Sequence, residues 1–198
     1  SSSGSETSTS DTSARSATGW ATNCPALSSI RRLPLRTVNR DVTGHGSPDI
    51  TADGRGLTVT VIAGSWHNEI TDGLIAGARR VLDAAGAAHT LIRVPGAFEL
   101  PLAAQTALRT GADAVVCLGV IIRGGTPHFD FVSNAATNGL TRVALDEGKP
   151  VGFGVLTLDD EQQGLDRAGL PGSREDKGAE AAAAAIATAV TVRDHLRA

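Results

Sequence analysis

Aromatic side chains are scarce in this sequence of 198 residues. There are four phenylalanines, two tryptophans and no tyrosine, so any ring beside polar or glycine-rich sequence becomes informative. No apolar run approaches the roughly 20 residues that a membrane-spanning helix needs, so we expect a soluble protein without a membrane partner. The charges nearly balance, with 18 basic and 21 acidic side chains and a formal net charge of −3. This balance excludes the strongly basic surface that is typical of nucleic-acid-binding proteins.

Sulfur and metal-ligating side chains are also sparse. The two cysteines, Cys24 and Cys117, are too few to build a disulfide framework. Cys117 lies within an apolar run, which is typical of a small residue in a protein core. The five histidines have no neighbouring ligands at the spacing that metal sites use, so we expect no bound metal.

The chain changes composition at about residue 56. Residues 1–16 are rich in serine and threonine, and the apolar residues of 20–38 follow no helical or strand periodicity. We therefore predict a mostly disordered extension over 1–56 and one folded domain over 57–198. The extension lacks the hydrophobic run of a secretory signal, and its acidic residues are atypical of a mitochondrial presequence. We expect a cytoplasmic protein, with organellar targeting by the extension as the weaker alternative.

The folded part alternates apolar, β-branched segments with segments of helical periodicity. This alternation predicts a parallel sheet whose two faces are covered by helices. The predicted strands lie at 57–63, 90–94, 113–122 and 151–156. The predicted helices run from 67 or 68 to 86, from about 99 onward, and over 130–147, 160–168 and 174–197. The last of these is rich in alanine, which is typical of a packed structural helix.

Ligands of parallel sheets bind beyond the carboxyl ends of the strands, which selects the loops at 64–69, 95–100, 122–131 and 156–161. In the first loop, Trp66 either covers the end of the core or stacks on a flat heteroaromatic ligand. In the second loop, Glu99 either complements the dipole of the helix that follows or accepts hydrogen bonds from ligand hydroxyls.

The third loop has the most specific composition. Gly124, Gly125 and Thr126 stand between a buried strand and a helix, where they can offer backbone N–H groups and a hydroxyl to an anion. The loop lacks the Gly-Lys-Ser/Thr ending of a Walker loop and the three-glycine fingerprint of dinucleotide sites. His128 follows at once, and it either orders the turn or places a group that titrates near neutral pH beside the anion.

Five segments of the domain resemble those of one enzyme family, in the same order along the chain. They lie at 64–68, 95–101, 118–130, 166–169 and 176–178. Together they are similar to the lumazine synthases, which catalyse the penultimate step of riboflavin biosynthesis. The resemblance covers about 57–195, and the extension has no counterpart in it. It implies a flavodoxin-like three-layer α/β sandwich with a four-stranded parallel sheet and helices on both faces.

The resemblance also implies a reaction and its residues. In it, 5-amino-6-(ribitylamino)uracil condenses with 3,4-dihydroxy-2-butanone 4-phosphate to 6,7-dimethyl-8-ribityllumazine, with release of phosphate and water and without a metal or redox cofactor. The implied catalytic residue is His128, which transfers protons. The implied pyrimidine contacts are Trp66, which stacks on the ring, and Val120, Ile121 and Ile122. The implied ribityl contacts are Ala97, Phe98 and Glu99, and the implied phosphate contacts are Gly125, Thr126 and Arg167. Two further residues are Phe153, which closes the site from an adjacent subunit, and Lys177, near the phosphate end.

Family members form pentameric rings with active sites between subunits, and some assemble pentamers into an icosahedral shell. Those shells are associated with a short connection between the last two helices. The connection at 170–176 is longer and contains Pro171, so the resemblance predicts an isolated homopentamer. Two other interpretations are a flavin- or lumazine-binding protein without turnover and an assembly module that carries the extension as cargo. His128 and Arg167 favour the enzyme, because a protein that only binds needs neither.

Overall fold

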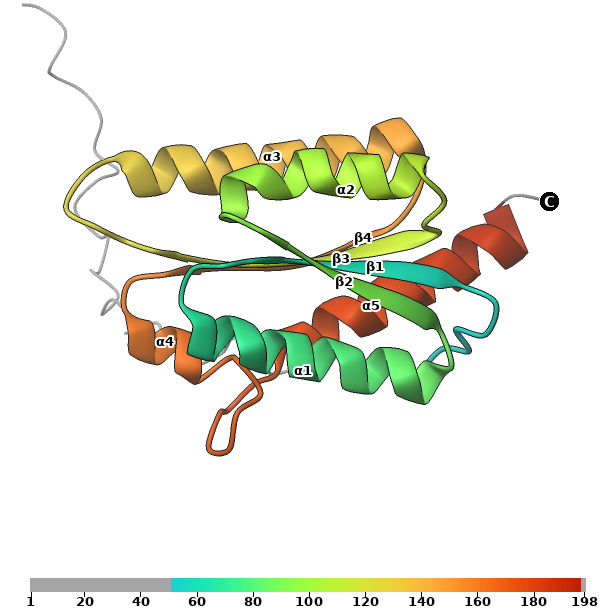
Figure 1. Cartoon of the computed structure of the whole chain (residues 1–198), viewed down its shortest axis with the longest axis horizontal. Coiled ribbons are helices and arrows are strands. Elements are labelled where there is room, and N and C mark those ends of the chain that lie inside the picture. Colours follow the sequence, from blue (N-terminus) through green and yellow to red (C-terminus); the bar gives the residue numbers. More distant parts are fainter. Residues whose placement is uncertain (1–50, 197–198) are drawn as a thin grey trace, which may run out of the picture. The chain divides into compact units, whose positions relative to one another are not determined.

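The structure is a computed structural model that describes residues 51–196 (Figure 1). Its strands are β1 (Thr58–Gly64), β2 (Ala88–Val94), β3 (Ala114–Ile122) and β4 (Val151–Leu158). Its α-helices are α1 (Asn68–Ala85), α2 (Leu100–Arg109), α3 (His128–Glu147), α4 (Glu161–Leu165) and α5 (Lys177–Thr191). A 3₁₀ turn, η2 (Ala97–Glu99), precedes α2, and a π-helical turn, η3 (Val192–Leu196), follows α5.

The four strands form one parallel sheet in the order β2-β1-β3-β4. This is the strand order with which flavodoxin-like folds begin. Helices α2 and α3 cover one face of the sheet, and α1, α4 and α5 lie on the other (Figure 1). The predicted three-layer α/β architecture is therefore confirmed.

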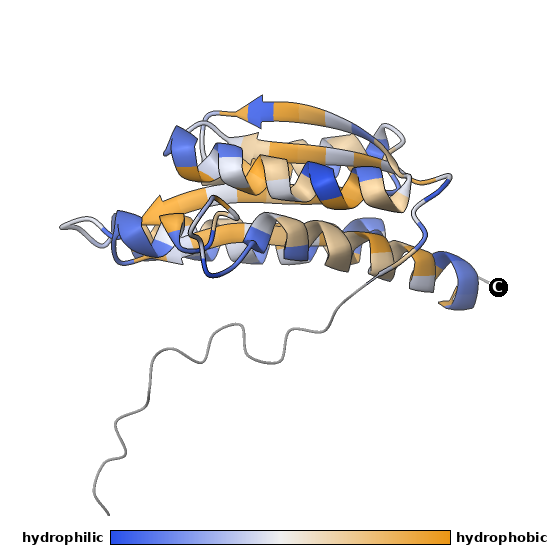
Figure 2. Ribbon diagram, turned by 90° about the horizontal axis from the view of Figure 1, so that it is seen from below, coloured by the Kyte–Doolittle hydropathy of each residue, from blue (hydrophilic) through white to orange (hydrophobic). Residues whose placement is uncertain are grey.

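Hydrophobic cores lie on both faces of the sheet, because successive side chains of a strand point to opposite faces. In β3, Val116 and Leu118 pack toward α1 and α5, whereas Val115 and Cys117 pack toward α2 and α3. In Figure 2 the strands are mainly hydrophobic, whereas the helices mix hydrophobic and hydrophilic residues. Burial raises the pKa of the Cys117 thiol to about 12, so the predicted core role of this residue is confirmed.

Helix α5 packs closely on both the sheet and α1. It buries Gly178, Ala181, Ala182, Ala185, Ile186 and Ala189. A Cβ atom at Gly178 would lie 2.0 Å from the carbonyl oxygen of Leu74 in α1, and one at Gly152 would lie 2.3 Å from that of Ala181. Small residues on both sides therefore set the spacing, and the predicted structural role of the alanine-rich helix is confirmed.

Several element ends differ from the prediction. Helix α3 begins at His128 rather than at 130, with Pro127 at its N-cap, and β4 continues to Leu158 rather than ending at 156. Helix α4 is shorter than the predicted 160–168, because the carbonyl of Asp166 accepts the backbone N–H groups of residues 174 and 175. Helix α5 begins at 177 rather than 174, since the Asp176 side chain caps it by accepting from the N–H of Ala179.

The N-terminal extension predicted over 1–56 lies largely outside the described residues. Within the described part, the N–H of Gly54 donates to the carbonyl of Ala85 at 2.9 Å, and Ala52 packs against the core. The boundary at 56 stays a prediction. No helix among residues 51–196 combines the length and apolar character needed to cross a bilayer.

Candidate functional site

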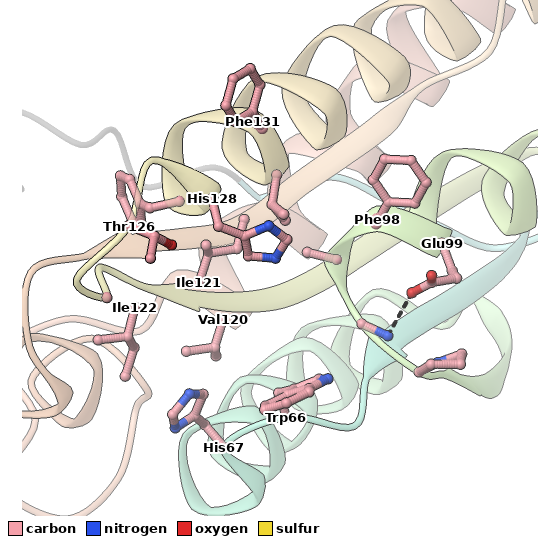
Figure 3. Close-up of a pocket in the computed structure, with 16 residues that line it drawn as sticks. Trp66, His67, Phe98, Glu99, Val120, Ile121, Ile122, Thr126, His128 and Phe131 are labelled. Carbon is pink, nitrogen blue, oxygen red and sulfur yellow. Dashed lines mark hydrogen bonds between the residues drawn. The ribbon is translucent and has the colours of Figure 1, made fainter.

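The carboxyl ends of β1, β2 and β3 meet at one edge of the sheet. The loops that follow these strands enclose a cavity of about 710 Å³ (Figure 3). Three of the four loops selected from the sequence therefore come together, as expected for a parallel sheet. The fourth loop, at 156–161, does not line this cavity.

The loop after β1 places an aromatic ring at the wall of the cavity. Trp66 is 68% exposed, so it does not cover the end of the core, and the stacking interpretation remains. Its backbone is fixed, because the Thr71 hydroxyl donates to the Trp66 carbonyl at 2.8 Å. Its indole also lies close to Gly96, where a Cβ atom would come within 3.5 Å of the ring.

His67 is a cavity residue that sequence reasoning set aside as a helix start. It stands at the N-cap of α1 in the left-handed region, with a φ of 54°, and its side chain forms no capping hydrogen bond. The ring lines the cavity beside Trp66 (Figure 3). The signal that could have revealed it is its place at a strand end, next to an aromatic residue and outside the regular helix.

The loop after β2 contributes Ala97, Phe98 and Glu99 to the lining of the cavity, and their role as ribityl contacts stays a prediction. The Glu99 carboxylate accepts the backbone N–H of Gly96 through Oε2 at 2.9 Å. Among residues 51–196 its other oxygen has no hydrogen-bond partner, which leaves that oxygen available to a ligand hydroxyl. Phe98 is 63% exposed, an unusual state for a large aromatic ring.

The end of β3 and the loop after it supply the remaining walls. Val120 and Ile121 are buried and Ile122 is half-buried, and all three line the cavity together with Thr126 and His128. Their imidazole, hydroxyl and apolar side chains face one space (Figure 3). The predicted phosphate contact Gly125 is in the same exposed loop but is not among the lining residues, whereas its neighbour Gly124 is.

Arg123, at the start of the glycine-rich loop, contacts an aromatic ring and two carboxylates. Its guanidinium lies over the ring of Phe129, 4.0 Å from the centroid, and its Nε donates to Oδ1 of Asp159 at 3.2 Å. A second carboxylate, that of Asp130, lies 3.6 Å away. The fourth loop therefore supports the site through Asp159 instead of contacting the cavity.

Phe153, Arg167 and Lys177 come together elsewhere. They line a second cavity of about 240 Å³ along β4, the strand at the edge of the sheet. The two cavities share no lining residue. Within one chain, the predicted phosphate contacts Thr126 and Arg167 therefore line different cavities.

Two basic side chains line the second cavity, and the carboxylate of Glu175 lies next to both of them. Burial alone would lower the pKa of the Lys177 ammonium, but the carboxylates of Glu180 and Glu175 outweigh this effect and raise the pKa. Arg167 lies 4.0 Å from the same Glu175 carboxylate, and its guanidinium also donates to the carbonyl of Gln163. The raised pKa of Lys177 favours its charged ammonium, and an ammonium beside the guanidinium of Arg167 suits the binding of an anion. Among residues 51–196, no group of three or more His, Cys, Asp and Glu side chains could hold a metal ion.

Comparisons with known proteins identify the family of the chain. The sequence model of the 6,7-dimethyl-8-ribityllumazine synthase family matches residues 56–193. The 6,7-dimethyl-8-ribityllumazine synthase of Leifsonia xyli subsp. xyli is 70% identical over 154 residues, which are 77% of this chain and 98% of that protein. The one of Clavibacter michiganensis subsp. michiganensis is 69% identical over 155 residues, 77% of this chain and 97% of that protein. The chain therefore belongs to the 6,7-dimethyl-8-ribityllumazine synthase family, whose reaction in riboflavin biosynthesis condenses 5-amino-6-(ribitylamino)uracil with 3,4-dihydroxy-2-butanone 4-phosphate.

Proposed function

We propose that the 710 Å³ cavity holds 5-amino-6-(ribitylamino)uracil and the reacting end of the four-carbon phosphate. Trp66 stacks on the pyrimidine ring, which the apolar end of β3 contacts along Val120, Ile121 and Ile122. The ribityl chain runs along 97–99, where Glu99 accepts hydrogen bonds from its hydroxyls. The observation that carries this assignment is the shared cavity, which surrounds one space with an exposed indole, a carboxylate and an imidazole.

We assign proton transfer to His128. Schiff-base formation, phosphate elimination and ring closure each move a proton, and an imidazole can both accept and donate one. His128 is the first residue of α3, and it shares the cavity with Thr126, which together with Gly125 we assign to the phosphate. This arrangement would place the proton donor beside the group that leaves. The reaction as proposed uses no metal or redox cofactor.

The phosphate clamp of Arg167, together with Phe153 and Lys177, is assigned to an adjacent subunit. In one chain these residues line a different cavity from Thr126, so a neighbouring copy is needed to bring them to the phosphate. Large apolar side chains near the first cavity support burial against another copy, because Phe98, Leu102 and Phe131 are 63%, 73% and 72% exposed. We propose a homopentamer with active sites between its subunits.

We further propose that the pentamers remain isolated and that the protein acts in the cytoplasm. The connection at 170–176 contains Pro171 and is held in place, because Ser173 accepts the N–H of Leu170 and donates to the carbonyl of Leu165. Such a fixed loop between α4 and α5 is longer than the connection that shell-forming members use. The relatives named above come from bacteria, and this favours the cytoplasm over an organelle.

The test combines the purified protein with both substrates and follows the absorbance of the lumazine product. We expect His128→Ala to lower kcat by at least about 100-fold, with the mass of five subunits retained in light scattering. His195→Ala, which changes an exposed histidine in η3, is the matched control and should keep full activity. Unchanged turnover of the His128 variant would remove this residue from proton transfer, and an active monomer would rule out the shared site.

A further inference from the structure

One carboxylate oxygen lies between the two cations of the second cavity. The Oε2 atom of Glu175 is 2.9 Å from Nζ of Lys177 and 4.0 Å from Nε of Arg167. The Glu175 side chain is 13% exposed, and those of Arg167 and Lys177 are 27% and 25% exposed. Glu175 was not a candidate in the sequence, because a carboxylate beside two basic residues is ordinarily a surface ion pair.

The backbone fixes Glu175 between its partners. The N–H of Glu175 donates to the carbonyl of Asp166 at 3.0 Å, and its own carbonyl accepts the N–H of Gly169 at 3.0 Å. The N–H of Lys177 donates to the carbonyl of Arg167 at 3.0 Å, so the two cation-bearing residues are joined directly. The three charged side chains therefore extend from a segment whose main chain is tied on both sides.

The contact between Glu175 and the cations is electrostatic and poorly directed. The buried Oε2 atom accepts no hydrogen bond of good geometry from the residues that the structure describes. A buried oxygen without such a bond is unfavourable, and in native proteins it calls for an explanation. The cations are thus held near a negative charge but keep donor positions for an anion that offers better geometry.

Glu180 provides the contrast. It also pairs with Lys177, through a hydrogen bond of 2.8 Å from Nζ, but it is 38% exposed and contacts that residue from one helical turn along α5. Arg167 has an ion pair with Glu175 and none with Glu180. Among residues 51–196, Glu175 is the one carboxylate that pairs with both cations.

We propose that Glu175 is a positioning residue that stands in for phosphate between Arg167 and Lys177 when the site is empty. Its charge holds the two cations side by side and offsets one of their two positive charges. The Glu175 charge therefore lowers the affinity of the two cations for free phosphate, so that the phosphate released in the reaction dissociates more readily. This role rests on the proposed function, in which Arg167 and Lys177 meet the phosphate of a substrate bound at the neighbouring subunit.

The test measures inhibition of the full-length enzyme by inorganic phosphate. Glu175→Gln keeps the shape of the side chain and removes its charge, so the inhibition constant for phosphate should fall at least about fivefold, the effect of one charge at about 4 Å in water. The KM for the pyrimidine substrate should not change. Glu180→Gln is the matched control and should alter the inhibition constant less than about twofold.

Further variants separate a failed role for Glu175 from a failed site. Glu175→Asp keeps the charge but moves it away from the cations, because its side chain is one methylene shorter. Its inhibition constant should therefore lie between those of wild type and Glu175→Gln. This variant still tests the proposal if the glutamine variant does not fold. Equal inhibition constants for wild type, Glu175→Gln and Glu175→Asp would overturn the proposal. Parallel changes in the KM values of the pyrimidine and of the four-carbon phosphate would also overturn it. Arg167→Ala should raise the inhibition constant. If Arg167→Ala raises the inhibition constant but Glu175→Gln does not change it, only the proposed role of Glu175 is wrong. If Arg167→Ala does not raise it, both the phosphate clamp and the role of Glu175 are wrong.

Discussion

The two halves of the proposed site are built in opposite ways. The glycine-rich loop at 123–128 is exposed along its whole length, and a Cβ atom added at Gly124 or Gly125 would meet nothing within 4 Å. The segment at 166–177 is internally bonded, and a Cβ atom at Gly169 would lie 2.5 Å from the Asp176 carboxylate. The glycine-rich loop therefore has open space next to its backbone, whereas side chains of the 166–177 segment pack against its own backbone.

The difference indicates a division of labour. An open loop with two glycines can bring its N–H groups close to an anion, but it gains its shape from the strand before it and from Arg123. The compact segment holds long, flexible arginine and lysine side chains in place before any ligand arrives, which lowers the entropy lost on binding. The site therefore pairs an adaptable half with a preorganised half, which the proposed pentamer brings together across an interface.

The largest effect is expected when the halves are disabled in separate chains. His128→Ala and Arg167→Ala should each lower activity by at least about 100-fold. Coexpression of the two variants should restore about a quarter of wild-type activity, because in a random ring that fraction of sites has both residues intact. The measurement is product formation by the purified mixed oligomer. His128→Ala coexpressed with the double variant is the control and should stay inactive; if the two single variants also fail to complement, the halves do not meet between subunits.

A smaller effect is expected from adding one methyl group in the open loop, at Gly125, or directly after the compact segment, at Gly178. In Gly178→Ala the new Cβ atom would lie 2.0 Å from the Leu74 carbonyl oxygen, so α5 must move away from α1. We expect a loss of about 1–3 kcal/mol in the free energy of unfolding. Gly125→Ala meets nothing within 4 Å and should change that free energy by less than about 0.5 kcal/mol. Urea unfolding at one protein concentration compares them, and equal midpoints would show that the packing contrast has no energetic consequence.

The smallest effect concerns pH in the compact segment. The pKa of Lys177 is raised above its usual 10.5 in the folded protein, so folding favours the charged ammonium. Its contribution to stability should be complete below pH 10.5 and should disappear as the pH rises through the raised pKa. Because the side chain is partly exposed, we expect the contribution to stay below about 1 kcal/mol. The measurement is the free energy of unfolding of wild type and of Lys177→Met between pH 9 and 11.5. The stability advantage of wild type should shrink as the pH rises, and an advantage that grows with pH would contradict this prediction.

Sequence reasoning succeeded where local composition decides the structure. The apolar run that ends at Ile122 specifies a buried central strand, and a parallel sheet brings the ends of β1, β2 and β3 together. Trp66, Glu99 and His128 could therefore be placed at one cavity before the structure was known. The geometry of the chain requires this result once the strands are parallel.

The rest depends on contacts between distant segments. Nothing in the order of Thr126 and Arg167 along the chain indicates that they line separate cavities, because this depends on how α4 and the loop after it pack. The early end of α4 depends on the carbonyl of Asp166, which bonds to residues 174 and 175. His67 was missed because a residue just before a helix ordinarily caps it, and this side chain does not.

The alanine-rich face of α5 has a consequence for the entropy of folding. Residues such as Ala181, Ala182 and Ala185 have no side-chain rotamers to lose when they are buried, whereas a leucine or isoleucine loses about 0.5–1 kcal/mol of rotamer freedom. Helix α5, which packs closely on the sheet, therefore loses no rotamer freedom at these alanine positions. Each alanine buries less apolar area than a leucine would, but it also has no side-chain torsion to fix on folding. The first turn of α5, which carries Lys177 next to Arg167, therefore belongs to a helix whose buried face costs little side-chain entropy.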